Sequence, residues 1–396
     1  MTITKSERIY FDHCATTKMY DEVKNVLLEY LGDNFGNPSS LYQTGRSLRK
    51  ALDDARETLA NEFGCDDTDI IFTSGGTESD NLAVYGCANS FFNSSATKDK
   101  GQLPQILVSS IEHEAVLKPA HLIHASLIKV LPNGVLDLEY LQTLLEEYKM
   151  SKAEVLFVSV MLVNNETGVI QPIGDAADLV KSYYPDALIH SDCVQAFASL
   201  DVREMTGEID LMSFSAHKFG GPMGTGALVV RKRARRNFQP VMRGGEQERG
   251  YRSGTENLPA IIAMAKAAQV SAAKRAEETK RLSRLAQKLK EGIKEISSEI
   301  IVVSEEVKKI EYIILLHTPN VFGEEICYLL DKENIEVSTG SACAAGAREP
   351  SHVLLAMGWP RQKARQVIRI SLGWTSSDTE IDRFLHSFSK VLKSFG

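Results

Sequence analysis

The residue with the clearest chemical potential is a lysine located where a buried strand is expected to end. Lys218 follows the apolar run from Ile209 to Phe214 and precedes glycines at 220, 221, 224 and 226. Short apolar runs bounded by Gly and Pro are typical of buried strands, and glycines allow close approach of backbone or ligand. A lysine that loses its solvation becomes a nucleophile toward carbonyl compounds. Considered alone, however, a lysine beside a glycine loop is more often a solvated surface residue.

A second feature is a glycine turn between an expected strand and an expected helix. The strand covers Asp69 to Phe72, the turn reads TSGGTE over residues 73–78, and a helical pattern continues to Phe92. The unpaired N–H groups of a first helical turn, together with the helix dipole, bind anions such as phosphate. The simpler interpretation is a helix capped by Thr77 without any ligand.

Strand-like runs alternate with helical patterns through much of the chain. The runs are 105–109, 127–131, 155–163, 187–191, 209–214 and 227–230, and the helical patterns include 136–148 and 175–184. This alternation predicts a mostly parallel sheet with helices on both faces, and ligands bind beyond the carboxyl ends of such strands. The polar side chains expected at those ends are His113, Asn164, Asn165, Asp192 and Gln195.

The last third of the chain has strand patterns of its own, at 310–316, 336–338 and 368–371. A long helical pattern from Pro259 to about Ile296 precedes them, and we expect it either to break or to link two domains. We therefore expect a large domain over residues 15–260 and a small domain formed by residues 1–14 together with 261–396.

Length and composition exclude several classes of protein. A chain of 396 residues is long enough for two domains or one large α/β unit. Its formal net charge of -7 argues against a nucleic-acid-coating surface. The amino terminus lacks an apolar signal region, no stretch approaches a membrane span, and six cysteines stand without pair spacing. We expect a cytoplasmic protein with free thiols that binds neither nucleic acid, membrane nor metal.

Three of these groups together match the needs of one cofactor, pyridoxal phosphate (PLP). Its aldehyde forms a Schiff base with a lysine, its phosphate suits a helix amino terminus, and a carboxylate favours protonation of its pyridine nitrogen. Lys218, the turn from Gly75 to Thr77 and Asp192 supply these in turn, and His113 could stack on the ring. Singly, His113 or Asp192 is more often a structural residue, so the prediction depends on their combination.

The motifs around these residues resemble those of a known family. They are FDHCATT at 11–17, FGNPSS at 35–40, TSGGTESDN at 73–81, EHEAVL at 112–117, VNNETGVIQPI at 163–173, SDCVQ at 191–195, SFSAHKFGGPMGTGAL at 213–228, RSGTEN at 252–257, STGSACAAG at 338–346 and EPSHVL at 349–354. Along nearly its whole length the chain resembles cysteine desulfurases of the NifS/IscS type, within the class V aminotransferase superfamily. The resemblance implies a fold type I PLP-dependent transferase, with a mostly parallel seven-stranded sheet in a large α/β domain and a smaller α+β C-terminal domain.

The resemblance also implies a role for each candidate site residue. Lys218 would bind PLP covalently, Asp192 would pair with the ring nitrogen, and Gln195 would hydrogen-bond the ring oxygen O3′. His113 would stack on the ring and assist proton transfer. Arg369 would clamp the substrate carboxylate, a task that suits its planar fork of donors, with Asn165 as a further contact to cofactor or substrate. The residues implied for the phosphate are Gly76, Thr77, Ser215, His217 and, reaching over from the second subunit of a homodimer, Thr255.

Cys343 decides the reaction type that the resemblance implies. It lies in a loop of small residues, 338–347, from which a thiol can swing toward a substrate. The implied reaction converts L-cysteine to L-alanine, with PLP as electron sink, Lys218 moving the α-proton and the Cys343 thiolate taking the sulfur as a persulfide. An acceptor protein would then receive this sulfur for iron–sulfur cluster or other thio-cofactor synthesis.

Other interpretations of the sequence stay open. A selenocysteine lyase or another β-eliminating PLP enzyme would share the cofactor site, and a non-catalytic sulfur-handling partner would keep only the fold. A dinucleotide enzyme is disfavoured because the glycines after Lys218 lack the G-x-G-x-x-G spacing. The chain departs from the usual family pattern at Cys14, Cys193, Gly76, Glu246 and Trp374, of which the two cysteines are candidates for additional thiols near the cofactor.

Overall fold

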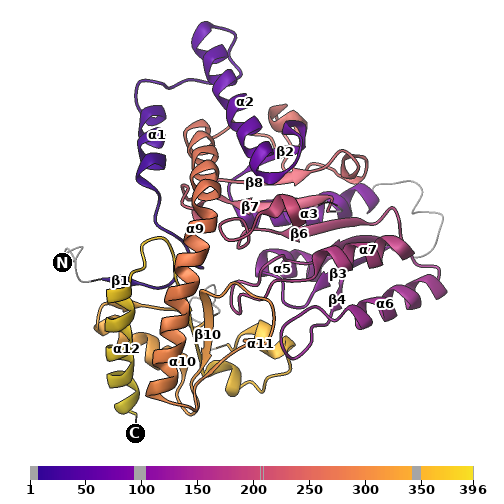
Figure 1. The fold of residues 1–396 in the computed structure, drawn as a ribbon. Helices are drawn as coiled ribbons and strands as arrows, with labels where there is room; N and C mark the ends of the chain where they lie inside the picture. The colour runs from indigo at the N-terminus through magenta and orange to yellow at the C-terminus, as the bar shows by residue number, and fades with distance from the viewer. Residues whose placement is uncertain (1–7, 93–103, 206, 208, 341–348, 396) are drawn as a thin grey trace.

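The computed structural model describes residues 8–92, 104–205, 207, 209–340 and 349–395, and its largest element is a seven-stranded sheet (Figure 1). The strands lie in the order β2 (Ile70–Thr73), β8 (Gly226–Val230), β7 (Leu211–Ser215), β6 (Leu188–Asp192), β5 (Val155–Ser159), β3 (Gln105–Ser109) and β4 (Ser126–Ile128). β8 is antiparallel to both of its neighbours, and all other pairs are parallel. The prediction of a mostly parallel seven-stranded sheet in an α/β fold is confirmed.

Helices cover both faces of this sheet, because successive residues of a strand point to opposite sides. In β2, Ile71 joins a core that α3 (Gly76–Phe92) and α5 (Glu114–Leu122) cover. Its neighbours Ile70 and Phe72 join the core on the other face. The helices over that second core include α2 (Gln43–Phe63), α6 (Leu138–Met150) and α7 (Ile173–Tyr183).

Several element boundaries follow local sequence signals, and two do not. The helix predicted to stop at Gly64 is α2, and Gly64 takes the left-handed φ of 68° that glycine adopts at little cost. The strand expected over 155–163 leaves the sheet at Ser159, although residues 160–163 stay buried. The strand expected over 127–131 ends at Ile128, and Val130 instead bridges to Leu136.

The C-terminal third forms two smaller sheets. β12 (Val367–Ser371), β10 (Ile313–His317) and β9 (Ile301–Val302) form one antiparallel sheet in that order, and β1 (Ile9–Tyr10) pairs in parallel with β11 (Ile335–Glu336). The helices of this part are α10 (Gly323–Lys332), α11 (His352–Ala356) and α12 (Asp378–Lys393). Because β1 joins the C-terminal elements, the pairing supports the predicted small domain of residues 1–14 and 261–396, and we propose that division.

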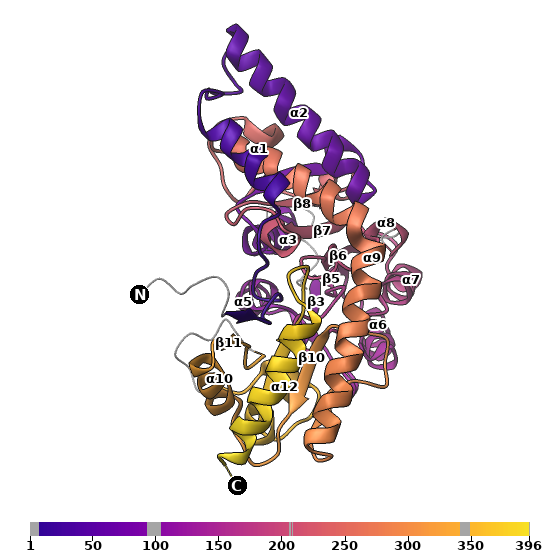
Figure 2. The same ribbon diagram turned by 60° about the vertical axis from the view of Figure 1, so that its left-hand side comes forward.

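One long helix, α9 (Leu258–Ile296), runs beside the seven-stranded and the three-stranded sheets (Figures 1 and 2). It continues for 39 residues, so the expected break in this helix is wrong. Its length fits the other expectation, that it links two domains. Its first half contacts α1 (Asp21–Leu31) and α2, and its second half contacts α12. Despite its length, neither α9 nor any other described helix is apolar enough to cross a membrane. The remaining short helices of the described residues are α8 (Val202–Met205), η1 (Asp67–Asp69), η2 (Ala216–Lys218), η3 (Ala234–Asn237), η4 (Gln247–Gly250) and η5 (Lys363–Arg365).

Leu289 tests how much the second half of α9 contributes to stability. Its side chain is fully buried in the main core, in line with Leu282, Leu285 and Ile293 along one helix face. Leu289→Ala should lower the free energy of unfolding by about 2–5 kcal/mol, because a cavity replaces the lost apolar contacts. Urea denaturation measures this, with Lys280→Ala on the exposed face as control. Equal stability of the two variants would contradict the role of this face.

Candidate active site

The carboxyl ends of β6 and β7 meet the turn that precedes α3. A Cβ atom added to Gly75 would lie 3.7 Å from Ser215 Oγ, and one added to Gly76 would lie 2.8 Å from Val194 Cγ2. Ser215 ends β7, and Val194 comes two residues after the end of β6. The structure thus brings together Gly76 and Ser215 of the predicted phosphate site, and the nearness of Val194 leaves little room for a side chain at position 76.

Thr77 lies inside the first turn of α3, because the helix begins at Gly76. Thr77 is therefore not the N-cap of this helix. Thr77 is exposed, whereas its neighbour Glu78 accepts a hydrogen bond from the Ser74 N–H at 2.7 Å and pairs with Arg252 at 2.8 Å. The unpaired N–H groups of such a first turn favour the binding of an anion at the start of the helix.

Lys218 is delivered by β7, as the apolar run predicted. It ends the short helix η2 (Ala216–Lys218), and its Nζ donates to the carbonyl oxygens of Cys14 and Ala15, the latter at 3.0 Å. The amine is half-buried beside the N-terminal segment. These two hydrogen bonds orient the Lys218 side chain at the carboxyl ends of the parallel strands. The amine there remains accessible to a ligand.

The two unusual cysteines are buried beside this site. Burial raises the pKa of the Cys14 thiol and of the Cys193 thiol above their ordinary range. Only a thiolate is a competent nucleophile, so both groups are held in the unreactive form at neutral pH.

His217 lies one residue before the lysine and carries no charge at neutral pH. Burial and the positive charge of Lys218 lower the pKa of His217 to about 4. Its Nδ1 lies 3.0 Å from Thr16 Oγ1, so a side chain of the N-terminal segment orients the ring. A neutral imidazole remains able to donate one hydrogen bond to a phosphate oxygen.

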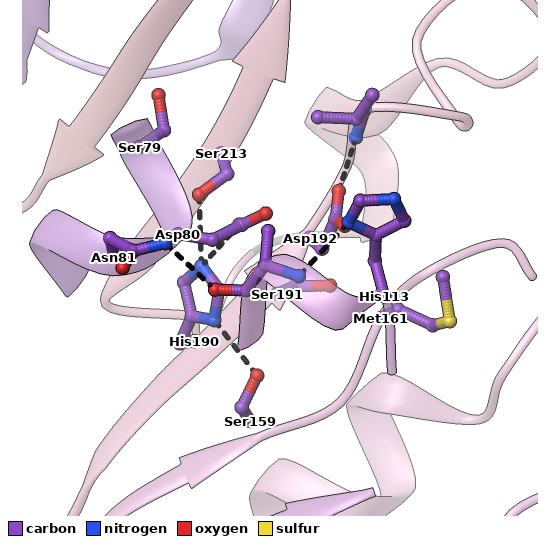
Figure 3. A network of polar contacts seen from close by, with 12 residues as sticks. Ser79, Asp80, Asn81, His113, Ser159, Met161, His190, Ser191, Asp192 and Ser213 are labelled. Carbon is purple, nitrogen blue, oxygen red and sulfur yellow. Dashed lines mark hydrogen bonds and ion pairs between the residues drawn. The ribbon is translucent and has the colours of Figure 1, made fainter. Parts of the chain in front are cut away.

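Asp192 ends β6 with its carboxylate buried next to His113 (Figure 3). Its Oδ1 accepts a hydrogen bond from the Val194 N–H at 2.8 Å. Burial raises the pKa of Asp192, while the nearby charges of His113 and Lys218 act in the opposite direction. A protonated pyridine nitrogen facing this carboxylate would add a further stabilising positive charge.

His113 is oriented by the helix that it caps. It is the N-cap of α5, and its Nδ1 accepts a hydrogen bond from the Ala115 N–H at 3.1 Å. When the ring is neutral, the proton is therefore on Nε2. The position beside Asp192 is consistent with the predicted stacking and proton transfer.

Two further carboxyl groups lie buried behind Asp192, and the sequence analysis did not identify them. Glu112 accepts a hydrogen bond from the Met161 N–H at 2.5 Å, and Asp80 projects from α3. Burial raises the pKa of both groups well above the ordinary range, and the negative charge of Asp192 adds to this effect. Glu112 and Asp80 are therefore neutral acids over much of the range in which Asp192 can be charged.

A buried histidine, His190, lies beside one of these acids, Asp80 (Figure 3). His190 Nδ1 lies 2.9 Å from Ser159 Oγ, and its Nε2 lies 3.0 Å from Ser213 Oγ and 3.6 Å from Asp80 Oδ1. Burial lowers the pKa of His190 to about 3, so it is a neutral imidazole. Such buried hydrogen-bonded side chains fix the geometry of the charged residue that they surround.

The side-chain amide of Gln195 has an unpaired hydrogen-bond acceptor. Its Oε1 is buried without a partner among the described residues. The side chain borders a cavity of about 70 Å³ that Lys218 and Cys14 also line. An unpaired buried amide costs about 1–3 kcal/mol, so a ligand that supplies a partner is favoured here.

Arg369 lies on β12 with an exposed fraction of 1%. Its Nη1 donates to the carbonyl oxygens of Asn165 at 3.0 Å and Gly340 at 3.1 Å, and its Nη2 donates to Asp12 Oδ1 at 2.6 Å. The structure thus brings together Arg369 and Asn165, the two residues predicted to meet the substrate. Asp12 was missed because 357 residues separate it from Arg369, and its motif at 11–17 was the only signal.

The loop that carries Thr255 is held in place from beneath. Within η4 (Gln247–Gly250), Glu248 takes a left-handed φ of 48° and receives hydrogen bonds from Arg56 at 2.8 and 2.7 Å. The Phe72 N–H donates to the same carboxylate at 2.9 Å, so the loop is joined to β2. Thr255 itself is exposed.

Cys343 lies outside the described residues, but both flanks of its segment end at the site. Gly340 before it contacts Arg369, and Ser351 after it donates to Glu166 Oε2 at 2.5 Å. His352 Nε2 lies 2.9 Å from the carbonyl oxygen of Glu112, the residue before His113.

The groups gathered at this edge of the sheet fit PLP. A lysine amine, a buried carboxylate, an unpaired buried amide and a glycine turn at a helix start all lie at one edge of the sheet. A buried Asp192 carboxylate that nearby positive charge stabilises is also what a site for a ring with a basic nitrogen requires.

The chain is similar to several known proteins. The family described as aminotransferase class-V matches residues 9–384. A protein named cysteine desulfurase IscS from Dictyoglomus turgidum is 35% identical over 97% of this chain and 94% of its own length. Among solved structures, a NifS-like protein matches with a TM-score of 0.87 and 32% identity over 98% of this chain and 100% of its own. A structure described as SspA in complex with cysteine matches with a TM-score of 0.74 and 28% identity, over 92% and 98%.

The raised pKa of Glu112 predicts how stability depends on pH. Below about pH 4 the carboxyl group is protonated in both the folded and the unfolded chain. As pH rises, the unfolded chain ionises first, so the free energy of unfolding falls until the raised folded pKa is reached. Glu112→Gln is neutral in both states and escapes this loss.

Thermal melts of the two proteins between pH 4.5 and 8 measure the effect. The difference in Tm, variant minus wild type, should grow with pH, while Glu147→Gln on the exposed face of α6 should show no such trend. A constant difference across this range would mean that Glu112 is ionised in the folded protein.

Proposed function

The chain belongs to the class-V aminotransferase family, and from this premise we propose that it acts as a PLP-dependent cysteine desulfurase. It converts L-cysteine to L-alanine and carries the sulfur as a persulfide on Cys343. Selenocysteine lyase or another β-eliminating activity would use the same cofactor site, but the relatives that align over nearly the whole chain carry the desulfurase name.

One observation carries the proposal most strongly. Lys218, Asp192 and Arg369 come from distant parts of the sequence, yet the N-terminal segment contacts both Lys218 and Arg369, and the charge of Lys218 acts on Asp192. A protein that merely kept the fold would have no need for a nucleophilic amine, a buried carboxylate and a buried guanidinium at one edge of a sheet.

The described residues support a division of labour around the cofactor. When bound, PLP withdraws electrons from the substrate carbon that loses its proton. Asp192 would accept the hydrogen bond of the ring nitrogen, Gln195 would bond the ring oxygen and His113 would cover the ring. The phosphate would be held by Gly76, Thr77, Ser215 and His217, with Thr255 from a second subunit.

Substrate handling would fall to the residues on the other side of the site. Arg369 and Asn165 would hold the carboxylate of L-cysteine, and Lys218 would move the proton at its α-carbon. The Cys343 thiolate would attack the substrate sulfur, so that an S–S bond forms while the C–S bond breaks and its electron pair stays with carbon. Protonation of that carbon yields alanine.

We further propose a homodimer in the cytoplasm that passes its persulfide to an acceptor protein. The exposed Thr255 and the fixed loop beneath it support the dimer, and the unpaired spacing of the cysteines supports a reducing compartment. The acceptor would use the sulfur for iron–sulfur clusters or another thio-cofactor.

Cys343→Ser tests the proposed reaction. The variant should keep the visible absorbance of bound PLP, carry no protein persulfide and release alanine from L-cysteine at least about a hundredfold more slowly, because hydroxyl oxygen cannot accept sulfur in this way. Alanine and persulfide are measured after addition of L-cysteine, with Cys327→Ser on α10 as the matched control. Alanine release equal to wild type would favour the elimination reaction instead.

Thr255 tests the proposed contribution across subunits. Thr255→Ala should weaken PLP binding about tenfold or more, because one hydrogen bond to a charged phosphate is lost. A mixture of Thr255→Ala and Lys218→Ala chains, dissociated and reassociated, should regain activity, since each mixed dimer then has one site with both wild-type residues. No recovery in demonstrated mixed dimers would show that Thr255 serves its own chain.

A further inference from the structure

The N-terminal segment Asp12–Thr17 contacts three groups of the candidate site. Asp12 binds Arg369, the carbonyl oxygens of Cys14 and Ala15 bind Lys218, and Thr16 faces His217. Of these contacts, only the Asp12 carboxylate brings a full charge to a group proposed to bind the substrate. The proposed function leaves that charge without a role.

The hydrogen bonds of Arg369 show which part of the guanidinium a substrate can use. A guanidinium has five N–H donors, one on Nε and two on each Nη. Both Nη1 donors are used by Asn165 and Gly340, one Nη2 donor is used by Asp12, and Nε has no partner among the described residues. Because Nε is itself buried, the second Nη2 donor is the one left for a ligand, and a carboxylate that accepts its hydrogen bond comes next to Asp12.

The positive charge of Arg369 already faces negatively charged carboxylates before any substrate binds. Asp12 Oδ1 lies 2.6 Å from Nη2, and the charge of the buried Glu166 also acts on the guanidinium. A single α-carboxylate can still bind, because its hydrogen bond to the remaining Nη2 donor is charge-assisted. A second anionic group on the same ligand gains no such bonds and is repelled by Asp12.

We propose that Asp12 is a specificity-determining residue of the Arg369 clamp, which orients the guanidinium and selects amino acids without a second anionic group. This inference relies on the proposed role of Arg369 in binding the substrate carboxylate. Two unit charges less than about 10 Å apart at the edge of a protein interior interact strongly enough to change an affinity about tenfold. Rejection of unwanted ligands by like charge is a common source of specificity.

The test compares an anionic and a neutral amino acid in wild type and Asp12→Asn. The asparagine Oδ1 can still accept the hydrogen bond from Nη2, so the substitution removes the charge and keeps the geometry. The probes are L-cysteate, which carries a sulfonate, and L-alanine, which carries no second charge. Dissociation constants are read from the change in visible absorbance of PLP in the holoenzyme, so the measurement does not depend on turnover.

Asp12→Asn should tighten the binding of L-cysteate about tenfold relative to L-alanine. Glu336→Gln is the matched control, because its carboxylate lies on the neighbouring strand β11 but pairs with Arg8 instead. It should leave the ratio of the two dissociation constants unchanged.

An unchanged ratio in Asp12→Asn would overturn the proposal, even if both constants shift together or the protein loses stability. If Asp12→Asn does not retain PLP, Asp12→Ser, which is also neutral and smaller, replaces it in the same comparison. Failure of the proposed desulfurase function is distinguishable, because wild type would then release no alanine from L-cysteine, whatever the ratio of dissociation constants.

Discussion

A carboxylate buried at the end of β6 sets the conditions that the rest of the site must meet. Asp192 is out of contact with bulk water, and a lone charge there costs several kcal/mol unless positive charge faces it. Lys218 supplies positive charge from the end of the neighbouring strand, while Glu112 and Asp80 avoid adding to the negative charge because they are neutral acids. The parallel order of the strands makes this possible, since it brings their carboxyl ends to one edge.

The two halves of the site lie on different sheets, and a few residues of extended chain hold them together. Lys218 follows the seven-stranded sheet, whereas Arg369 belongs to the three-stranded one. The segment from Asp12 to Ala15 contacts both, and its length limits their separation to roughly the 10–14 Å that such a stretch can span. The spacing between the Lys218 amine and the Arg369 guanidinium is thereby limited by the backbone.

Local patterns predicted much of the fold. The strand at 105–109 and the helix that ends before Gly64 were found where they were expected, because apolar periodicity and turn residues act over short distances. The strand expected over 155–163 was too long. Residues 160–163 are apolar because they are buried, but the strand ends before them. Apolar content alone does not distinguish burial from membership of a strand.

The candidate site was predicted in part. Lys218, Asp192 and Gly76 could be identified from their positions at strand ends, and the other roles came from a resemblance between motifs. The contact between Asp12 and Arg369 and the neutral state of Glu112 could not be predicted in this way, because both depend on three-dimensional neighbours. Charge state in particular depends on what surrounds a side chain, and residue type alone does not reveal it.

The pairing of β1 with β11 also has a consequence for how the protein is made. Ile9 lies opposite Ile335, so the first strand has no partner until most of the chain has left the ribosome. The segment that follows it, which contacts Lys218 and Arg369, must wait equally long, because β12 comes later still. The seven-stranded sheet can form earlier from residues 70–230. The site is therefore among the last parts to assemble. No partly made chain can hold both the Lys218 amine and the Arg369 guanidinium in place.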